Sequence, residues 1–371
     1  MHAAIVNLTS GGLSGGYKKY LQQLLPLLHA SPLISQLDVF SPRSAEFTGA
    51  DTQGYWTWPE SDGMTGYKQL RLELARRRPD VVFFPSARLV RLTQPSVVMV
   101  RNMEPLVAPF AGNSVRDGLK NIGRRIVARW SCLQATRVIA VSDFVRDFLV
   151  DNWRLSANKI GIVPHGVEPP LEPNLWDKPN ALTLPDDRPW IFAAGSIRPA
   201  RGLEDVVGAL NFNTSGTRLR LVIAGAASGD GEAYRKKLER TITQAGYTDD
   251  VVWTGPLSQR EMAWCYANCS VFAMTSRVEA CPNTALEALA YGAACIATTR
   301  RPMPETFADA TLYYEAGDSR MLARQIARVL QMGRQERGAL RRKALARAAD
   351  FTWPKTAAAT IQQLMLAANK S

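Results

Sequence analysis

Short apolar runs alternate with longer amphipathic stretches along most of the chain. Runs of strand length lie, for example, at 2–8, 81–84, 96–100 and 190–194. Between such runs, stretches like 17–28 carry leucines at the three- and four-residue spacing of a helix face. Strands that alternate with helices are typical of parallel sheets in α/β proteins. The pattern therefore predicts an α/β fold, and it shows no internal repeat.

A proline-rich stretch divides this series in two. Residues 168–189 contain six prolines and few apolar runs, which is the composition of a linker. A chain of 371 residues is long enough for two domains of about 150–200 residues each. We therefore predict a first domain over 1–168 and a second over 169–354.

The segment 270–298 reads as strand, loop, helix and strand. Residues 270–274 and 293–298 are apolar runs of strand length. Pro282 suits a first helical position because it has no N–H to leave unpaired, and Gly292 suits the helix end because it tolerates positive φ. The loop of such a unit lies at the carboxyl edge of a parallel sheet, where open α/β sheets bind ligands.

Two acidic residues mark this unit. Glu279 lies in the loop and Glu287 in the helix. The first-turn amides of a helix can hold a phosphate, a ribose can then reach Glu287, and Glu279 can meet the group beyond the phosphate. Two solvent-exposed acids explain the same pair, since acids are favoured near a helix start. The helix is apolar nearly all round, however, and a buried acid needs a partner, which favours a functional Glu287.

The block resembles the Glu-x7-Glu signature of glycosyltransferase family 4, the retaining sugar transferases with the GT-B fold. The residues that match the motif are Ser276, Glu279, Ala280, Cys281, Pro282, Asn283, Glu287, Ala288 and Gly292. The resemblance implies two Rossmann-like domains with a cleft between them. It also implies that a C-terminal helix, at about 355–371, crosses back to the first domain.

Three further segments resemble the family pattern. Gly15 and Gly16 match the glycine pair that faces the donor diphosphate and the acceptor, although a glycine loop alone is equally a flexible turn. Arg198 and Arg201 stand where the family has an arginine and a lysine to neutralise the leaving diphosphate. Asn102 stands where members commonly have a histidine; it can bind a sugar hydroxyl but cannot do the histidine's proton chemistry.

The resemblance therefore implies a retaining, metal-independent hexosyltransferase without a cofactor, whose donor is a nucleoside-diphosphate sugar. The acceptor would be a glycan or a lipid-linked group, as in cell-surface polysaccharide or lipopolysaccharide biosynthesis. The implied catalytic residues are Glu279, Asn102, Arg198 and Arg201. The implied donor-binding residues are Gly15, Gly16, Gly255, Ala280, Cys281, Pro282, Asn283, Thr284 and Glu287. Two alternatives stay open: a non-catalytic nucleotide-sugar-binding partner, and another GT-B enzyme such as a sugar-nucleotide epimerase.

Charge and composition add a possible partner. The formal net charge is +12, and five cations, Arg116, Lys120, Arg124, Arg125 and Arg129, lie largely on one side of a predicted helix. A solvated face is the ordinary explanation, and we find no nucleic-acid motif, so anionic membrane is the better functional candidate. Without a predicted membrane span or signal peptide, we expect a cytoplasmic protein, at most peripheral to the inner face of the membrane.

Two smaller expectations concern the first domain. Residues 46–66, rich in Gly, Asp, Thr and aromatic residues, are expected to form a long loop. His165, in a Pro-His-Gly-Val turn before the linker, is one of three histidines, and its turn context predicts a structural rather than a catalytic residue.

Overall fold

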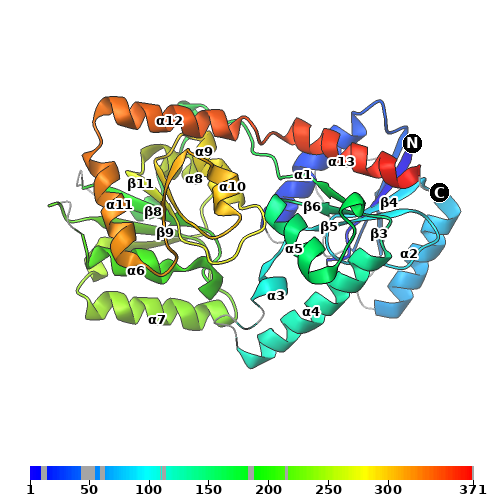
Figure 1. Ribbon diagram of the computed structural model, residues 1–371, viewed down its shortest axis with the longest axis horizontal. Coiled ribbons are helices and arrows are strands. Elements are labelled where there is room, and N and C mark those ends of the chain that lie inside the picture. The colour runs from blue at the N-terminus through cyan, green and yellow to red at the C-terminus, as the bar shows by residue number, and fades with distance from the viewer. Residues whose placement is uncertain are drawn as a thin grey trace. The chain divides into compact units, whose positions relative to one another are not determined.

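The computed structural model describes the whole chain except residues 10–14, 43–54, 59–62, 109, 111–113, 183–187, 214–215 and 370–371. It contains two compact units, each built on one parallel sheet (Figure 1). The first unit comprises Met1–Leu106, Asn121–Gly166 and Thr352–Ser371, and the second comprises Val107–Lys120 and Val167–Phe351. Just before the proline-rich stretch at 168–189, the chain passes from the first unit to the second between Gly166 and Val167.

The first unit holds a seven-stranded sheet with the order β3-β2-β1-β4-β5-β6-β7. Every neighbouring pair is parallel. Its strands are β1 (His2–Val6), β2 (Gln36–Pro42), β3 (Tyr55–Trp58), β4 (Val81–Phe84), β5 (Ser96–Val100), β6 (Arg137–Ala140) and β7 (Ile160–Ile162). The central strands β4 and β5 are buried throughout, as expected where helices cover both faces of a parallel sheet.

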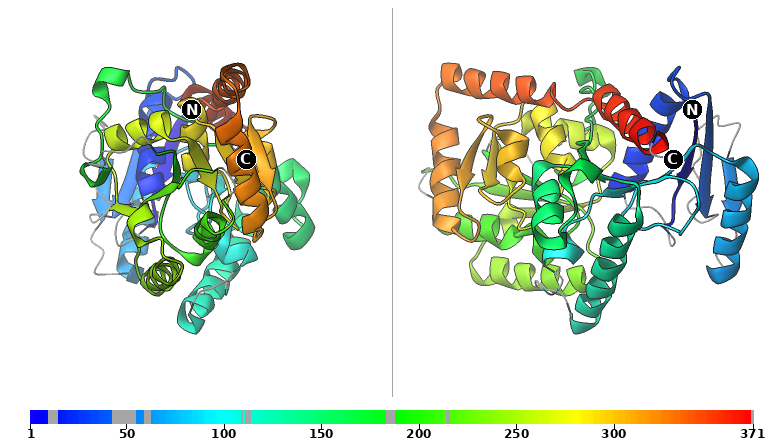
Figure 2. Two further views of the ribbon diagram at one scale, coloured as in Figure 1. Left: turned by 90° about the vertical axis from the view of Figure 1, so that its left-hand side faces the viewer. Right: turned by 45° about the vertical axis from the view of Figure 1, so that its right-hand side comes forward.

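The helices from these parts of the chain are α1 (Gly15–His29), α2 (Gly63–Arg77), α3 (Glu104–Val107), α4 (Val115–Gln134), α5 (Asp143–Trp153) and α13 (Trp353–Ala368). A short 3-10 helix, η2 (Ala157–Lys159), precedes β7. The last helix, α13, red in Figures 1 and 2, packs against α1 and the central strands β4, β5 and β6. Buried Gln363 on α13 accepts a hydrogen bond from Arg137 Nε at 2.8 Å. The expectation that the C-terminal helix returns to the first domain is confirmed.

The second unit holds a six-stranded sheet with the order β10-β9-β8-β11-β12-β13, again with every pair parallel. Its strands are β8 (Trp190–Ala194), β9 (Arg220–Ala224), β10 (Val251–Gly255), β11 (Val271–Met274), β12 (Cys295–Thr298) and β13 (Thr311–Tyr314). Successive side chains of a strand point to opposite faces. On β8, Ile191 and Ala193 accordingly join one buried cluster and Phe192 joins the other.

Helices from the second half of the chain cover this sheet. They are α6 (Leu203–Leu210), α7 (Asp230–Gln244), α8 (Gln259–Asn268), α9 (Asn283–Ala290), α10 (Met303–Phe307), α11 (Ser319–Gln331) and α12 (Arg334–Ala348). Short 3-10 helices lie at η3 (Pro173–Leu175), η4 (Asn180–Leu182), η5 (Pro199–Arg201) and η6 (Thr248–Asp250). Ser258 and Glu261 form a capping box at the start of α8, a device that pairs two backbone amides of the first turn.

Two local expectations need correction. The segment 46–66 is not all loop: Tyr55–Trp58 is the edge strand β3, paired in parallel with β2, and α2 begins at Gly63. Aromatic contact between Trp56 and Phe40, with ring centroids 5.6 Å apart, supports this pairing. The rest of the expected loop, at 46–54 and 59–62, lies outside the described residues. Pro282 is the N-cap of α9 rather than its first helical residue.

Among the described residues, no helix is both long enough and apolar enough to cross a bilayer.

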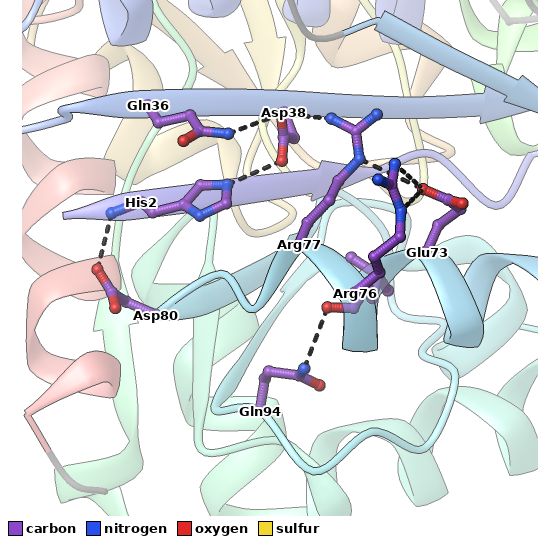
Figure 3. A network of polar contacts seen from close by, with 9 residues as sticks. His2, Gln36, Asp38, Glu73, Arg76, Arg77, Asp80 and Gln94 are labelled. Carbon is purple, nitrogen blue, oxygen red and sulfur yellow. Dashed lines mark hydrogen bonds and ion pairs between the residues drawn. The ribbon is translucent and has the colours of Figure 1, made fainter.

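A polar network ties β1, β2 and α2 together at the amino edge of the first sheet (Figure 3). Asp38 on β2 is 1% exposed. Its carboxylate lies 2.8 Å from His2 Nε2 and accepts a hydrogen bond from Arg77 Nη1 at 2.9 Å. Gln36 Nε2 donates a further, longer bond to it at 3.4 Å. A buried carboxylate needs such partners to offset the loss of water.

We predict that Asp38→Ala lowers the free energy of unfolding by about 3 kcal/mol, because Arg77 Nη1 and His2 Nε2 both lose their contact with the buried carboxylate. Urea denaturation of the whole chain measures this. Arg76→Ala is the matched control from the same network: its guanidinium is largely exposed, so the midpoint should hardly move. Equal shifts for both variants would contradict the importance given to Asp38.

Candidate active site

Two loops of the second unit lie side by side at the carboxyl edge of its sheet. One follows β8 and carries Arg198 and Arg201; the other follows β11 and carries Glu279. Hydrogen bonds join their backbones: Arg277 N donates to Ala200 O at 2.8 Å, and Thr275 Oγ1 donates to Arg201 O at 2.7 Å. The fold therefore sets the loop that carries the two predicted cations against the loop that carries the predicted acid.

Arg201 and Glu279 form an ion pair in this place. Arg201 Nη1 donates to Glu279 Oε1 and, at 3.3 Å, to Ser276 Oγ. Both charged side chains are largely but not fully buried, at 16% and 12% exposed. Sequence reasoning assigned the two residues separate ligand groups and did not foresee that they contact each other. Because the pair still touches solvent, an incoming anion can compete for the arginine.

The buried carboxylate of Asp205, on α6, anchors the loop that follows β11. It is 2% exposed and accepts two hydrogen bonds from Arg277, at 2.6 Å each. It also accepts hydrogen bonds from Tyr314 Oη and Gly317 N, both at 2.9 Å. Two parallel bonds between a guanidinium and a carboxylate fix both groups in angle as well as distance. Arg277 stands two residues before Glu279, so this contact anchors the loop that carries the acid.

The protonation states of this network follow from its contacts. Burial alone would lower the pKa of Arg277, but the hydrogen bonds and charge of Asp205 outweigh burial and raise it. Burial raises the pKa of Tyr314, and the neighbouring Asp205 charge raises it further. The arginine is thus charged and the tyrosine neutral at ordinary pH, which is the combination that donates to a carboxylate. Sequence reasoning missed Asp205 and Arg277 altogether.

Glu287 has the partner that its position in a buried helix requires. Tyr266 Oη on α8 donates to Glu287 Oε2 at 3.0 Å. The tyrosine ring is fully buried and stacks on Tyr291 with centroids 5.9 Å apart. Burial, followed by the charge of Glu287, raises the pKa of Tyr266 well above its usual value. The glutamate is half-buried, so its carboxylate is positioned by the protein while it remains reachable.

The residues between the two glutamates form the start of α9. Ala280 and Pro282 are buried, and Cys281, Asn283 and Thr284 are half-buried. The carbonyl of Pro282 accepts hydrogen bonds from the amides of residues 285 and 286, at 3.1 and 3.2 Å. Gly292, with φ +67°, ends the helix as predicted. The predicted donor-binding segment is therefore a helix start whose first turn is partly accessible.

Glycines let the strand ends of the second sheet approach one another closely. Gly255, at the end of β10, has φ +72° and accepts a hydrogen bond from Gly225 N at 2.8 Å. A Cβ on Gly225 would lie 1.9 Å from Gly195 O. A Cβ on Gly195 would meet the guanidinium of Arg201 at 2.9 Å. A side chain at Gly225 would therefore push against the backbone of the loop that follows β8, and one at Gly195 would displace the Arg201 guanidinium.

The predicted residues of the first unit gather around the start of α1. Gly15 and Gly16 begin the helix; the preceding residues 10–14 lie outside the described part of the chain. Arg101, at the end of β5, donates to Gly16 O at 3.0 Å, and its guanidinium lies over the ring of Tyr17 at 4.6 Å. Burial raises the pKa of Tyr17 to about 12. Arg101, which sequence reasoning did not single out, thus fixes the glycine pair to the sheet.

Asn102 and His165 have local structural contacts. The exposed Asn102 accepts a hydrogen bond through Oδ1 from Glu104 N at 3.2 Å, and so caps the short helix α3. This contact fits an asparagine at a helix start and leaves its amide group open to a further bond. His165 is buried, with its ring 5.2 Å from that of Tyr20, in keeping with the structural role expected for it.

Within the described residues, no group of three or more His, Cys, Asp and Glu side chains is placed to hold a metal ion.

Two family models match the chain along nearly its whole length. The model described as Glycosyltransferase Family 4 matches residues 15–170, and the model described as Glycosyl transferases group 1 matches residues 175–347. The chain belongs to glycosyltransferase family 4. The family expected from the Glu-x7-Glu block is therefore confirmed.

Curated relatives of this family 4 chain include D-inositol 3-phosphate glycosyltransferases. The protein of Stackebrandtia nassauensis is 31% identical over 223 residues, which are 57% of this chain and 49% of the relative. That of Mycolicibacterium smegmatis is 27% identical over 250 residues, 66% of this chain and 55% of the relative. The chain spans about half the length of the curated relatives it matches.

Solved structures share the fold of this family 4 chain over its full length. Sucrose-phosphate synthase from Thermosynechococcus elongatus has a TM-score of 0.78 at 18% identity, covering 100% of both chains. Anabaena HepE in complex with UDP-glucose has a TM-score of 0.71 at 16% identity, covering 99% of this chain and 100% of HepE. Identities this low show the fold alone: the two parallel sheets with their helices are the two domains of the GT-B fold.

We predict that Gly202→Ala loosens the paired loops. Gly202 has φ +61°, and a Cβ there would lie 2.4 Å from Thr275 O. The left-handed conformation costs about 1–2 kcal/mol and the overlap about 1–3 kcal/mol more. Gly246→Ala is the matched control, since φ is +76° there with nothing within 4 Å of its Cβ. Urea denaturation should show a larger loss of unfolding free energy for Gly202→Ala than for Gly246→Ala. Equal losses would mean that the close contact between Gly202 and Thr275 does not contribute to stability.

Proposed function

We propose that this family 4 chain transfers a sugar from a nucleoside-diphosphate sugar to a glycan or lipid-linked acceptor, with retention at the anomeric carbon and without a metal. The observation that carries the proposal is the joined pair of loops in the second unit. There Arg201 contacts Glu279, while Glu287 lies further along the chain, in α9, and accepts a hydrogen bond from Tyr266. The proposal assigns Arg201 to the diphosphate, Glu279 to the donor sugar and Glu287 to the ribose.

The donor site is argued from charge. Arg198 and Arg201 supply fixed cations for the phosphates, and the first turn of α9 supplies amides and the positive end of a helix dipole. Such groups stabilise the charge that builds up on the departing diphosphate. Two solved structures of the same fold hold UDP or UDP-glucose according to their descriptions, which supports a nucleotide-sugar donor for this chain as well.

The ion pair of Arg201 with Glu279 suggests how donor binding prepares the site. A diphosphate carries more negative charge than one carboxylate and competes for Arg201. The competition releases Glu279 toward the sugar, where it can bind hydroxyl groups or the developing positive charge at the anomeric carbon. On this proposal the pair is the resting state of the site, and Ser276 keeps Arg201 in place during the exchange.

The acceptor is assigned to the first unit. Gly15, Gly16 and Asn102 lie at the carboxyl edge of its sheet, near Arg101, and offer backbone groups, a side-chain amide and a cation. The curated relatives are named for an inositol phosphate acceptor, and two proteins of the same fold are named for lipopolysaccharide synthesis. These names support a phosphorylated or lipid-linked acceptor, in cell-surface glycan synthesis. The cytoplasmic location expected from the sequence stays a prediction.

We predict that one of the diphosphates UDP, GDP and ADP raises the thermal midpoint of the protein, that the monophosphate CMP does not, and that Glu287→Ala abolishes the rise. A ligand at about 100 times its dissociation constant adds about 2.7 kcal/mol to stability. Glu336→Ala, an exposed glutamate on α12, is the control and should keep the full shift. If the thermal midpoint of Glu287→Ala still rises with the nucleotide, the assignment of Glu287 to the ribose is wrong.

We predict that Glu279→Gln separates binding from transfer. The substitution keeps the size of the side chain but removes the carboxylate that competes for Arg201. The nucleoside diphosphate identified above should therefore bind at least as tightly, while transfer falls by a factor of about 100 or more. Calorimetry measures the first quantity and product formation from the labelled donor measures the second.

Glu232→Gln, at an exposed position on α7, is the control for both measurements. Unchanged transfer by Glu279→Gln would overturn the role of the acid. Release of an isomerised sugar without any acceptor would favour the epimerase alternative, and tight binding with no turnover in the wild type would favour a non-catalytic partner.

A further inference from the structure

Tyr266 reaches Glu287 from a fixed place in the core of the second unit. Its side chain is buried, at 1% exposed. Phe192 and Phe272 pack against its ring edge to face, each with centroids 5.4 Å apart. Tyr291 stacks on it, with 20° between the ring planes. A ring enclosed this closely has no room to change rotamer, so its hydroxyl stays at one point.

Tyr291 and Glu287 lie one helical turn apart at the end of α9. Tyr291 N donates to Glu287 O at 3.1 Å, and residues four apart share one face of a helix. Tyr266 contacts both of them: its ring lies on Tyr291, and its hydroxyl donates to Glu287 Oε2 at 3.0 Å. Tyr266 therefore joins α8 to the face of α9 that carries the acid.

The proline-rich stretch holds Tyr291 in turn. Leu171 N donates to Tyr291 Oη at 3.0 Å, and the ring of Trp176 lies edge to face with that of Tyr291, with centroids 6.1 Å apart. Trp176 Nε1 donates to Leu171 O at 2.8 Å, which ties the two contacts together. Tyr291 is thus fixed at its hydroxyl and at its ring, and it gives Tyr266 a rigid surface to stack on.

A neutral hydroxyl orients Glu287 without cancelling its charge. Burial, followed by the charge of Glu287, raises the pKa of Tyr266 well above its usual value, so the tyrosine stays protonated and donates. A carboxylate has about four positions at which it accepts hydrogen bonds, and Tyr266 takes one of them. A lysine or arginine in its place would fix the carboxylate as well, but would neutralise it.

We propose that Tyr266 is a positioning residue that makes the donor site select ribose over deoxyribose. It holds the Glu287 carboxylate in the orientation that accepts hydrogen bonds from ribose hydroxyls. A carboxylate free to rotate loses side-chain entropy when it binds, and this loss lowers affinity. A deoxyribose lacks one of the hydroxyls and gains nothing there from the fixed orientation. The inference rests on the proposed role of Glu287 in ribose binding.

Calorimetry of the whole protein tests this inference. The ligands are the diphosphate among UDP, GDP and ADP that raises the thermal midpoint, and its 2′-deoxy and 3′-deoxy forms. The wild type should bind the ribose form about tenfold more tightly than one of the deoxy forms, since a hydrogen bond to a charged group is lost. Tyr266→Phe should weaken the ribose form about fivefold and change that deoxy form by less than about twofold.

Tyr247→Phe is the matched control. Tyr247 is half-buried in the same unit, and its hydroxyl donates to the backbone, at Leu210 O, over 3.0 Å. The variant also removes one tyrosine hydrogen bond, so urea denaturation should show a similar loss of stability. Its ratio of affinities for the ribose and deoxyribose forms should stay that of the wild type. A purely structural Tyr266 would behave in the same way as this control.

A double variant shows whether Tyr266 acts through Glu287. Glu287→Gln replaces the carboxylate by a neutral amide, to which the tyrosine hydroxyl bonds less strongly. In that background Tyr266→Phe should cost less than about twofold in affinity for the ribose form, compared with about fivefold in the wild type. Full additivity of the two losses would mean that Tyr266 does not act through Glu287.

The outcomes separate this inference from the proposed function. A Tyr266→Phe variant that keeps the wild-type ratio, or losses that add fully in the double variant, would overturn the role of Tyr266 and leave the donor site intact. A wild type that binds a diphosphate but does not distinguish ribose from either deoxyribose would overturn the ribose assignment of Glu287, and this inference with it. Failure of all three diphosphates to bind would do the same and would also contradict the donor site.

Discussion

Asp205 takes hydrogen bonds from three separate segments of the second unit. Arg277 comes from the loop after β11, Tyr314 from the end of β13, and Gly317 from the turn before α11. Removing its charged partner, Arg277, would leave the buried carboxylate without a compensating charge, at a cost of about 3–5 kcal/mol. The loop that carries Glu279 therefore keeps a single geometry only while the Asp205 carboxylate retains all of these partners.

The contacts of the two arginine–carboxylate pairs suit them to different roles. Asp205 and Arg277 are bound to each other at two points, and Arg277 also pairs with Glu204 at 3.1 Å. Arg201 and Glu279 are joined at one point and remain partly exposed. A bidentate pair on a fully buried carboxylate is suited to holding a loop in place, whereas a single contact between two partly exposed groups is suited to exchange. The proposed chemistry is therefore assigned to Arg201 and Glu279.

Local signals in the sequence were enough for most of the fold. The β11–α9–β12 unit could be read because Gly292 marks the helix end and apolar runs mark both strands. Strand β3 could not, since an edge strand of four residues among Gly and Asp lacks the long apolar run of a central strand. Asp205 and Arg277 are 72 residues apart, and no periodicity or spacing connects them.

The central claim is that the loops after β8 and β11 act together as one donor site. Amide hydrogen exchange of the whole protein, with and without the nucleoside diphosphate that stabilises it, tests this most directly. The account predicts slower exchange in both loops, at 195–203 and at 276–287, with no comparable change at the amino edge of either sheet. Protection of only one loop, or of neither while the thermal midpoint rises, would contradict it.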